Sequence, residues 1–352
     1  MGNACAPKLH EVDGEALEAD REINKALKRD RKEQEIERRL LLLGAGESGK
    51  STICKQFLIL NNSFTEKDRL SYAYFIQVVA INCMRTLIMR VINELHSSLL
   101  VDANLVRDSS FEAERPLTKD LSTAIKRLWE SDLIQQAYSQ RKEYYLPECA
   151  SFLFQNIMRY CEADYIPTEE DCLRVRKRTC GVAEYTFNHE GIKFRVIDVG
   201  GQRSERRKWL VAFEGYITAV LYTIACEEYD MHLAEAAGVN RMLEALQLFA
   251  DVTATGVLQN IPIILFFNKS DLLKEKLKQG ITPASLFKEY KGGDNYDACI
   301  EFLTKTFMSV APANSKMYPH VTCGLDTENL RHVWKVTKDI ILSSNLKLLG
   351  VT

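Results

Sequence analysis

Residues 40–52 read LLLLGAGESGKST, a run of four leucines that leads directly into a glycine-rich loop ending in a lysine and two hydroxyl residues. A short apolar run bounded by glycine is typical of a strand buried on both faces of a parallel sheet. Residues 44–51 fit the pattern G-x-x-x-x-G-K-[ST], between this predicted strand and a predicted helix at 52–60. This context predicts a phosphate-binding loop.

The loop explains why an apolar strand meets a flexible, cationic segment. Its backbone N–H groups can converge on phosphate oxygens at the positive end of the following helix. The lysine is expected to reach the β- and γ-phosphates, and the first hydroxyl to bind Mg²⁺. The predicted phosphate contacts are Glu47, Ser48, Gly49, Lys50, Ser51 and Thr52. The alternative, a glycine–serine turn with a surface lysine, is disfavoured by the flanking strand and helix.

Length and composition restrict the class of protein. A chain of 352 residues predicts two domains, or one domain with a large insert. The net charge of −2 gives no general attraction to nucleic acid, so no nucleic-acid partner is expected. Ten cysteines without C-x-x-C pairs favour reduced thiols over a disulfide framework or a zinc site. No apolar run approaches the length needed to cross a bilayer, and the best one, 261–267, suits a buried strand.

The order of predicted elements indicates an α/β fold. Strand-like runs at 40–43, 193–199, 219–226, 261–267 and 320–323 alternate with helical patterns such as 232–252 and 327–349. This alternation predicts a parallel sheet covered by helices on both faces. From about 65 to 175 only helical periodicity occurs, which predicts an all-helical insert. The charge-rich stretch 8–39 predicts a long exposed helix, with Ile23 and Leu27 on one face.

The segment Asn268, Lys269, Ser270, Asp271 follows the predicted strand 261–267 and suggests which base is bound. The carboxylate of Asp271 can accept hydrogen bonds from N1–H and N2–H₂ of guanine, whereas adenine would leave it unpaired. The methylene stem of Lys269 can lie along the face of the ring. By itself N-K-x-D is more often a polar turn, but after a strand and beside a phosphate loop it predicts guanine.

A third motif, DVGGQRSERRKW at 198–209, follows another predicted strand. Asp198 can hold Mg²⁺ through water, the N–H of Gly201 can sense the γ-phosphate, and Gln202 can orient the attacking water. The glycine pair permits close backbone approach and a conformational change when that phosphate leaves. The alternative is a β-turn with incidental charge.

With these motifs and TCG at 322–324 in this order, the chain resembles the alpha subunit of a heterotrimeric G protein nearly end to end. The resemblance implies a Ras-like P-loop GTPase with a doubly wound, mostly parallel sheet and an inserted all-helical domain. It implies an N-terminal helix over 1–39, a GTPase domain over 40–64 and 175–352, and an insert over 65–174. It also implies slow hydrolysis of GTP to GDP with Mg²⁺, by which the protein acts as a timed switch.

The resemblance interprets LRVRKRTCGV at 173–182 as the first switch. Arg176 matches the built-in arginine finger, and Thr179 the hydroxyl that binds Mg²⁺ when the γ-phosphate is present. The assignment depends on the register, because Arg174, Lys177 and Arg178 are also cationic. Glu47 is expected to pair with Arg176. Leu173 and Arg174 are expected to lie against the nucleotide.

The resemblance also identifies Thr322, Cys323 and Gly324 as the loop whose N–H groups contact guanine O6. Gly324 occupies the usual position of an alanine, and Leu325 that of a common threonine. Because glycine adds backbone freedom, we expect moderately faster loss of GDP than in typical members. Glu148, in the segment that faces the nucleotide from the insert, is expected to reach Lys269.

The implied partners are a beta-gamma dimer, a G protein-coupled receptor, effectors and GTPase-accelerating (RGS) proteins. Ile23 and Leu27 match the beta-gamma stripe of the N-terminal helix. The second switch is the segment that begins with the motif at 198–209. Trp209 and Phe213, four apart on its helix, are the expected aromatic anchors, with core packing as the alternative. The C-terminal tail resembles the receptor-reading tail, but Leu349 replaces the cysteine that pertussis toxin modifies in one subclass.

The N-terminus MGNACA offers Gly2 for myristate and Cys5 for palmitate, although Ala6 stands where myristoylation usually has serine or threonine. Two lipids would give stable anchoring. We therefore expect a peripheral protein at the cytoplasmic face of the plasma membrane, with a soluble cytoplasmic pool. One alternative function is a guanine nucleotide-binding scaffold with negligible turnover, which Arg176 and Gln202 disfavour. Another is an ATP-dependent enzyme, which Asp271 disfavours.

Overall fold

The structure is a computed structural model that describes residues 37–111, 116–141, 144, 146–233, 235–236 and 238–348. Nearly all of the expected N-terminal helix lies outside these residues, as do Gly2, Cys5, Ile23, Leu27 and Leu349. Residues 37–39, which the sequence analysis gave to that helix, belong instead to the first strand.

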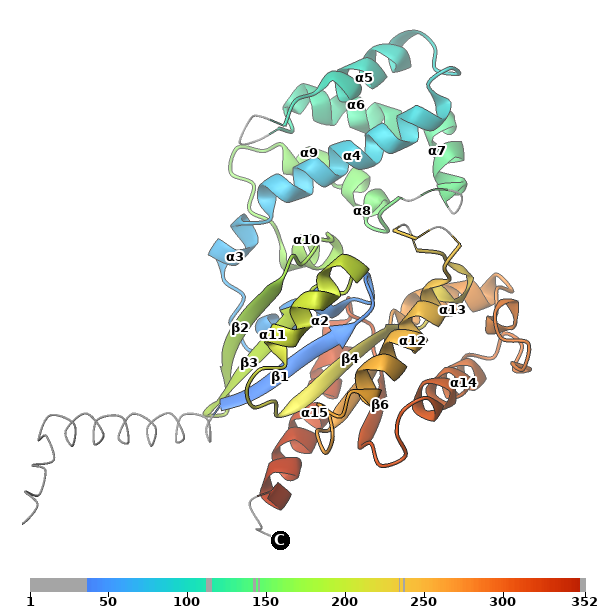
Figure 1. The fold of residues 1–352 in the computed structure, drawn as a ribbon. Coiled ribbons are helices and arrows are strands. Elements are labelled where there is room, and N and C mark those ends of the chain that lie inside the picture. Colours follow the sequence, from blue (N-terminus) through green and yellow to red (C-terminus); the bar gives the residue numbers. More distant parts are fainter. Residues whose placement is uncertain are drawn as a thin grey trace, which may run out of the picture.

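A six-stranded sheet forms the centre of the α/β part of the chain, with the strand order β2-β3-β1-β4-β5-β6 (Figure 1). Its neighbours are parallel except for β2 and β3, which are antiparallel. The strands are β1 Glu37–Gly44, β2 Val182–His189, β3 Ile192–Val199, β4 Ala219–Ala225, β5 Ile263–Asn268 and β6 Met317–Val321. The predicted α/β fold with a mostly parallel sheet is confirmed.

The strand predictions were wrong in two places. β2 was not predicted, because it is an edge strand in which only Phe187 is fully buried, so it lacks a continuous apolar run. β6 begins at Met317 and ends at Val321, so it overlaps the predicted strand 320–323 only at 320–321, and its side chains are only partly buried or exposed. Both errors concern the edges of the sheet, where the hydrophobic signal is weakest.

Helices cover both faces of the sheet. They are α2 Lys50–Leu60, α11 Trp209–Ala212, α12 Arg241–Ala254, α13 Ser270–Lys278, α14 Tyr296–Ser309 and α15 Thr327–Leu348, with short 3₁₀ helices η2 Arg203–Lys208, η3 Glu228–Asp230 and η4 Pro283–Ser285. The helix predicted at 232–252 begins only at Arg241, because the side chain of Asn240 caps it by accepting the N–H groups of Met242 and Leu243. The described residues 231–233, 235–236 and 238–239 before this cap are not helical.

The leucines of β1 show why this strand is apolar throughout. Leu40 and Leu42 pack with α2 and α15 on one face of the sheet. Leu41 and Leu43 pack with α11, α12, α13 and α14 on the other face. All four side chains are completely buried. Since the strand ends at Gly44, this packing fixes the start of the glycine-rich loop at the carboxyl edge of the sheet.

Among the described residues between Glu66 and Arg174, the regular elements are helices, joined by turns and loops. They are α3 Glu66–Leu70, α4 Ala73–Val91, α5 Ser97–Asp108, α6 Lys119–Trp129, α7 Asp132–Ser139, α8 Ala150–Gln155, α9 Ile157–Tyr160 and α10 Glu169–Arg174. Helices α4 to α9 form a separate hydrophobic core, and Figure 1 shows them standing beyond the sheet edge at which β1 ends.

One stretch of the insert, Glu66–Val91, is long and apolar enough to cross a membrane by length and composition alone. The expectation that no apolar run approaches the length needed to cross a bilayer was therefore wrong. Its side chains Ile76, Ala80, Met84 and Leu87 are completely buried in the core of the insert. The apolar surface of this stretch is therefore used to pack the insert.

Candidate active site

The predicted phosphate loop connects β1 to α2 with backbone conformations that restrict its sequence. Gly49 precedes the helix with φ +98°, and a Cβ atom there would lie 2.1 Å from Nδ2 of Asn268. Glu47 also has a positive φ, +68°. The loop brings the six predicted phosphate contacts together at the start of α2, where the helix dipole favours an anion.

Lys50 points back into this loop. Its ammonium donates hydrogen bonds to the carbonyl oxygens of Gly44 and Ala45, at 2.9 and 2.8 Å. Burial lowers the pKa of Lys50 to about 8, against the opposing effect of Asp198. The amine thus lies within the loop that is expected to hold the phosphates.

Three oxygen atoms from three segments meet beside the loop. The hydroxyl of Ser51 lies 2.7 Å from that of Thr179 and donates a 2.7 Å hydrogen bond to Oδ2 of Asp198. Thr179 donates to the same oxygen at 2.9 Å. Among the residues that the structure describes, Oδ1 of Asp198 is buried and finds no hydrogen-bond partner. Hard oxygen donors and one unpartnered carboxylate oxygen fit Mg²⁺.

The second switch lies against the opposite side of the loop. A Cβ atom at Gly201 would lie 2.3 Å from the ammonium of Lys50, so only glycine fits there. The side chain of Gln202 packs on Gly46, whose Cβ position lies 3.3 Å from its Cγ atom. The structure therefore places Gly201 beside the lysine that is expected to bind the γ-phosphate, and Gln202 against Gly46 of the same loop.

The two switch segments are joined to each other. The carboxylate of Glu205 accepts hydrogen bonds from the N–H of Gly181, at 2.6 Å, and from the ammonium of Lys208, at 2.7 Å. The guanidinium groups of Arg203 and Arg206 both bind Glu244 on α12. Because Gly181 follows Thr179 closely, a movement of the second switch would be transmitted to the predicted Mg²⁺ ligand.

The aromatic pair of the second switch, the expected partner anchors, is not exposed in this structure. Trp209 is buried, and its indole N–H donates a 2.7 Å hydrogen bond to the carbonyl oxygen of Gly200. Phe213 is partly buried and packs against the main core. The exposed apolar side chains of α11 are Leu210 and Val211, at 73% and 60%. The core-packing alternative therefore describes this pair.

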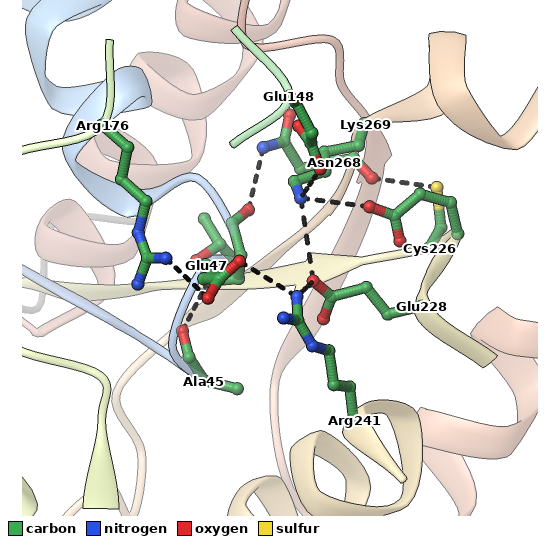
Figure 2. A network of polar contacts seen from close by, with 12 residues as sticks. Ala45, Glu47, Glu148, Arg176, Cys226, Glu228, Arg241, Asn268 and Lys269 are labelled. Atoms are coloured by element: carbon green, nitrogen blue, oxygen red, sulfur yellow. Dashed lines mark hydrogen bonds and ion pairs between the residues drawn. The ribbon is translucent and has the colours of Figure 1, made fainter. Parts of the chain in front are cut away.

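A chain of charges crosses the site from Arg176, as Figure 2 shows. Nη1 of Arg176 lies 2.5 Å from Oε1 of Glu47, and Nη1 of Arg241 lies 3.0 Å from Oε2 of the same carboxylate. Arg241 also binds Glu228 at 2.9 Å. Burial opposes the charge on Arg241, but Glu228 and Glu47 outweigh it and raise its pKa. Glu47 is thus held between two arginines.

Lys269 is surrounded by acids (Figure 2). Its ammonium lies 3.0 Å from Glu148 of the insert, 3.0 Å from Glu227 and 3.7 Å from Glu228. Burial raises the pKa of Glu227 to about 7. Burial opposes the charge of Lys269, yet the three acids raise its pKa well above the ordinary value. The contact between Glu148 and Lys269 joins the insert to the GTPase part.

Asn268 connects the phosphate end of the site to its base end. Its Nδ2 donates to the carbonyl oxygen of Ser48 at 2.9 Å. Its Oδ1 accepts the N–H of Gly324 at 2.9 Å and the hydroxyl of Thr322 at 3.2 Å. In this structure Asn268 therefore positions both loops.

The remaining residues of the predicted base site lie around the start of α13. Asp271 is in its first turn, and its carboxylate is hydrogen-bonded to the thiol of Cys323; burial and this contact raise the thiol pKa. A cavity of about 210 Å³ separates α10 from the loop after β6; it is lined by Glu169, Glu170, Leu173, Arg174, Leu325 and Thr327. Leu173 and Arg174 therefore face the base loop, and Arg174 also binds Glu170.

Sequence reasoning missed several of these residues. Glu227 and Glu228 follow the end of β4 after Cys226, so their position after a strand was a usable signal. Arg241 was hidden inside the helix wrongly predicted at 232–252. Glu244 carried no signal, because an acid on an amphipathic helix usually faces solvent.

Two comparisons with known proteins both match G-protein alpha subunits. The family model described as G-alpha, the G-protein alpha subunit, matches residues 18–341. The chain is also similar to the guanine nucleotide-binding protein alpha-9 subunit of Dictyostelium discoideum. The two are 38% identical over 337 residues, which cover 95% of this chain and 97% of the relative.

Proposed function

The chain belongs to the family of G-protein alpha subunits, guanine nucleotide-binding proteins of heterotrimeric G protein signalling, and we propose that it is a slow GTPase that acts as a timed switch. The observation that carries the proposal is the meeting of Ser51, Thr179 and Asp198 within 2.9 Å of one another beside the phosphate loop. Hydroxyl and carboxylate oxygens beside a phosphate loop are the ligands that Mg²⁺ takes when it is bound with a nucleotide.

Mg²⁺ would be held by the hydroxyls of Ser51 and Thr179, with Asp198 acting through water, and when bound it supplies positive charge to the β- and γ-phosphate oxygens. Lys50 adds a second positive charge from within the loop. Because Thr179 belongs to the first switch, its contact with this site would depend on the nucleotide state.

The hydrolytic step requires a positioned water and neutralised charge on the γ-phosphoryl oxygens. Gln202 lies against the loop at Gly46 and would orient the water through its amide. Arg176 would contact the γ-phosphoryl oxygens after exchanging its contact with Glu47 for them. Asp271 would select guanine, and Lys269 would hold the ring on a stem fixed by Glu148 and Glu227.

The family membership supports a beta-gamma dimer and a G protein-coupled receptor as partners in general. We propose that Leu210 and Val211 on α11 belong to the surface that partners read, since they are the most exposed apolar side chains of the described second switch. Effectors, RGS proteins, lipid on Gly2 or Cys5, and a location at the cytoplasmic face of the plasma membrane are also proposed.

The test is to measure nucleotide binding and turnover separately on the purified full chain. GTP and ATP are first competed for binding with and without Mg²⁺, and phosphate release from bound GTP is then timed in a single turnover. Selective GTP binding with slow, Mg²⁺-dependent phosphate release supports the proposal. Selective binding without release would instead indicate a scaffold, and equal ATP binding would contradict the base assignment.

A further inference from the structure

Thr223 is a buried hydroxyl residue of β4 that the site described above does not include. It lies in register with Gly44, where β1 gives way to the phosphate loop. Its side chain is completely buried between apolar neighbours in sequence. A buried hydroxyl is costly unless it is hydrogen-bonded. Its partners therefore indicate what the residue does.

Those partners all lie in or next to the phosphate loop. Oγ1 of Thr223 lies 2.8 Å from Oγ of Ser48, where either hydroxyl can donate, and 3.1 Å from the carbonyl oxygen of Leu43, which can accept its proton instead. Oγ of Ser48 is 3.0 Å from the carbonyl oxygen of Ala45. The two hydroxyls have one proton each for these three contacts. Thr223 thus links the entry of the loop to its centre.

The backbone of the loop at Gly44 also packs directly against Thr223. A Cβ atom at Gly44 would lie 2.4 Å from the carbonyl oxygen of Thr223, 2.7 Å from its Oγ1 and 2.9 Å from Oγ of Ser48. The φ angle of Gly44, +142°, is also one that other residues rarely adopt. The backbone can approach the hydroxyl only because residue 44 has no side chain.

Ser48 is held from its other side as well. Its carbonyl oxygen accepts the 2.9 Å hydrogen bond from Asn268, whose own Oδ1 binds the base loop. Its side chain is bound to β4 through Thr223. The backbone of Ser48 is therefore fixed between two strands, and its N–H belongs to the group expected to converge on the phosphates.

We propose that Thr223 is a positioning residue for nucleotide retention: its hydroxyl holds Ser48 so that the loop is ordered before a nucleotide binds. This inference rests on the proposed function, because it concerns the same site. The loop contacts the phosphates in the ground state and during hydrolysis alike, so a loosened loop weakens binding more than it slows the chemical step.

The first test is Thr223→Val, which removes the hydroxyl and keeps the shape. In the full chain loaded with labelled GDP, we expect about three- to tenfold faster GDP dissociation, the effect of one lost hydrogen bond. Single-turnover hydrolysis of bound GTP should change by less than about twofold. The matched control, Thr223→Ser, keeps the hydroxyl and should restore slow dissociation.

A double-mutant cycle with Ser48→Ala identifies the partner. If the two hydroxyls act as a pair, the double variant releases GDP no faster than the faster single variant. Additive effects, a wild-type rate for Thr223→Val, or equal acceleration by Thr223→Ser would each overturn the proposal. If Thr223→Val does not fold, Thr223→Ala, which also removes the hydroxyl, must accelerate GDP release, and a wild-type rate of release in that variant would overturn the proposal. A wild-type chain that retains no GDP would instead refute the proposed function.

Discussion

The guanidinium of Arg176 and the carboxylate of Glu47 lie 2.5 Å apart, so the segment that leaves the insert is tied to the phosphate loop. Glu47 is shared with Arg241, which is itself bound to Glu228. Arg176 therefore has a fixed place next to the phosphates and a partner that it must exchange to act on them. Loop, first switch and α12 are coupled through this one carboxylate.

The first prediction tests Arg176. Arg176→Cys should bind GTP but hydrolyse it at least about 100-fold more slowly, because a cation at the γ-phosphoryl oxygens is lost. Single-turnover phosphate release measures this. Lys177→Ala is the matched control, since it removes a neighbouring cation that is exposed and stacks on Tyr72. Slow hydrolysis in the control and an unchanged rate in Arg176→Cys would move the role to Lys177.

A second prediction concerns the attacking water. Gln202→Leu should retain GTP with near wild-type affinity and lose hydrolysis by about 100-fold or more, because the amide that orients the water is gone. Binding and single-turnover release are measured on the same preparation. Gln247→Leu, on the exposed side of α12, controls for a general effect of the substitution. Hydrolysis at the wild-type rate in Gln202→Leu would refute the assignment.

The contact between insert and GTPase part supplies a third prediction. Glu148→Gln should release GDP about two- to fivefold faster, because it weakens the ion pair with Lys269 that helps to hold the insert over the nucleotide. The rate of labelled-GDP dissociation is the readout. Glu130→Gln removes another exposed acid of the insert, paired only locally with Lys126, and should leave the rate unchanged. Equal rates for Glu148→Gln and wild type would contradict the prediction.

Gly324 leads to a fourth prediction. Its N–H binds Asn268 at 2.9 Å and its carbonyl oxygen accepts from Gln56 at 3.0 Å, so the loop is pinned in the folded state. Gly324→Ala should slow GDP loss by about two- to fivefold through reduced backbone freedom. The new methyl group would lie 3.2 Å from Cγ2 of Thr52. Adding Thr52→Ser removes that contact, and faster GDP loss even in this double variant would argue against the prediction.

The pKa of Glu227 supplies a fifth prediction, about stability. Burial raises it to about 7, from an ordinary value of 4.5, so the folded state keeps a proton that the unfolded state has lost. The contribution of this bound proton to the free energy of unfolding is fully present below pH 4.5 and is lost as the pH rises through about 7. The side chain in Glu227→Gln does not ionise, so the stability of this variant lacks that pH dependence. The unfolding temperature of the variant, relative to wild type, should therefore rise between pH 5.5 and pH 8.

Glu148→Gln controls for this pH effect with the opposite sign. Burial opposes ionisation of Glu148, but Lys269 outweighs it and lowers its pKa. Its stabilisation is therefore present above the ordinary carboxyl range and is lost in acid. Glu148→Gln should lower the unfolding temperature most at pH 8 and least in acid. A Glu227→Gln difference that does not change with pH would refute the prediction.

Much of the fold follows from the sequence, because the hydrophobic pattern reports burial. The four leucines of β1 lie between two layers of helices, and a strand buried on both faces has to be apolar at every position. The five predicted strands and the helical insert are present. β2 and the start of α12 were missed, since an exposed edge and a capping asparagine leave little hydrophobic trace.

The sequence alone determined the local parts of the site: a phosphate loop, a base motif, and acids and hydroxyls of the types that bind Mg²⁺ and water. The fold decided which distant residues meet. Glu47 binds Arg241 across 194 positions, and Ser48 meets Thr223 across 175 positions. No local pattern encodes such pairs, because they arise only when parallel strands align their carboxyl ends at one edge of a sheet.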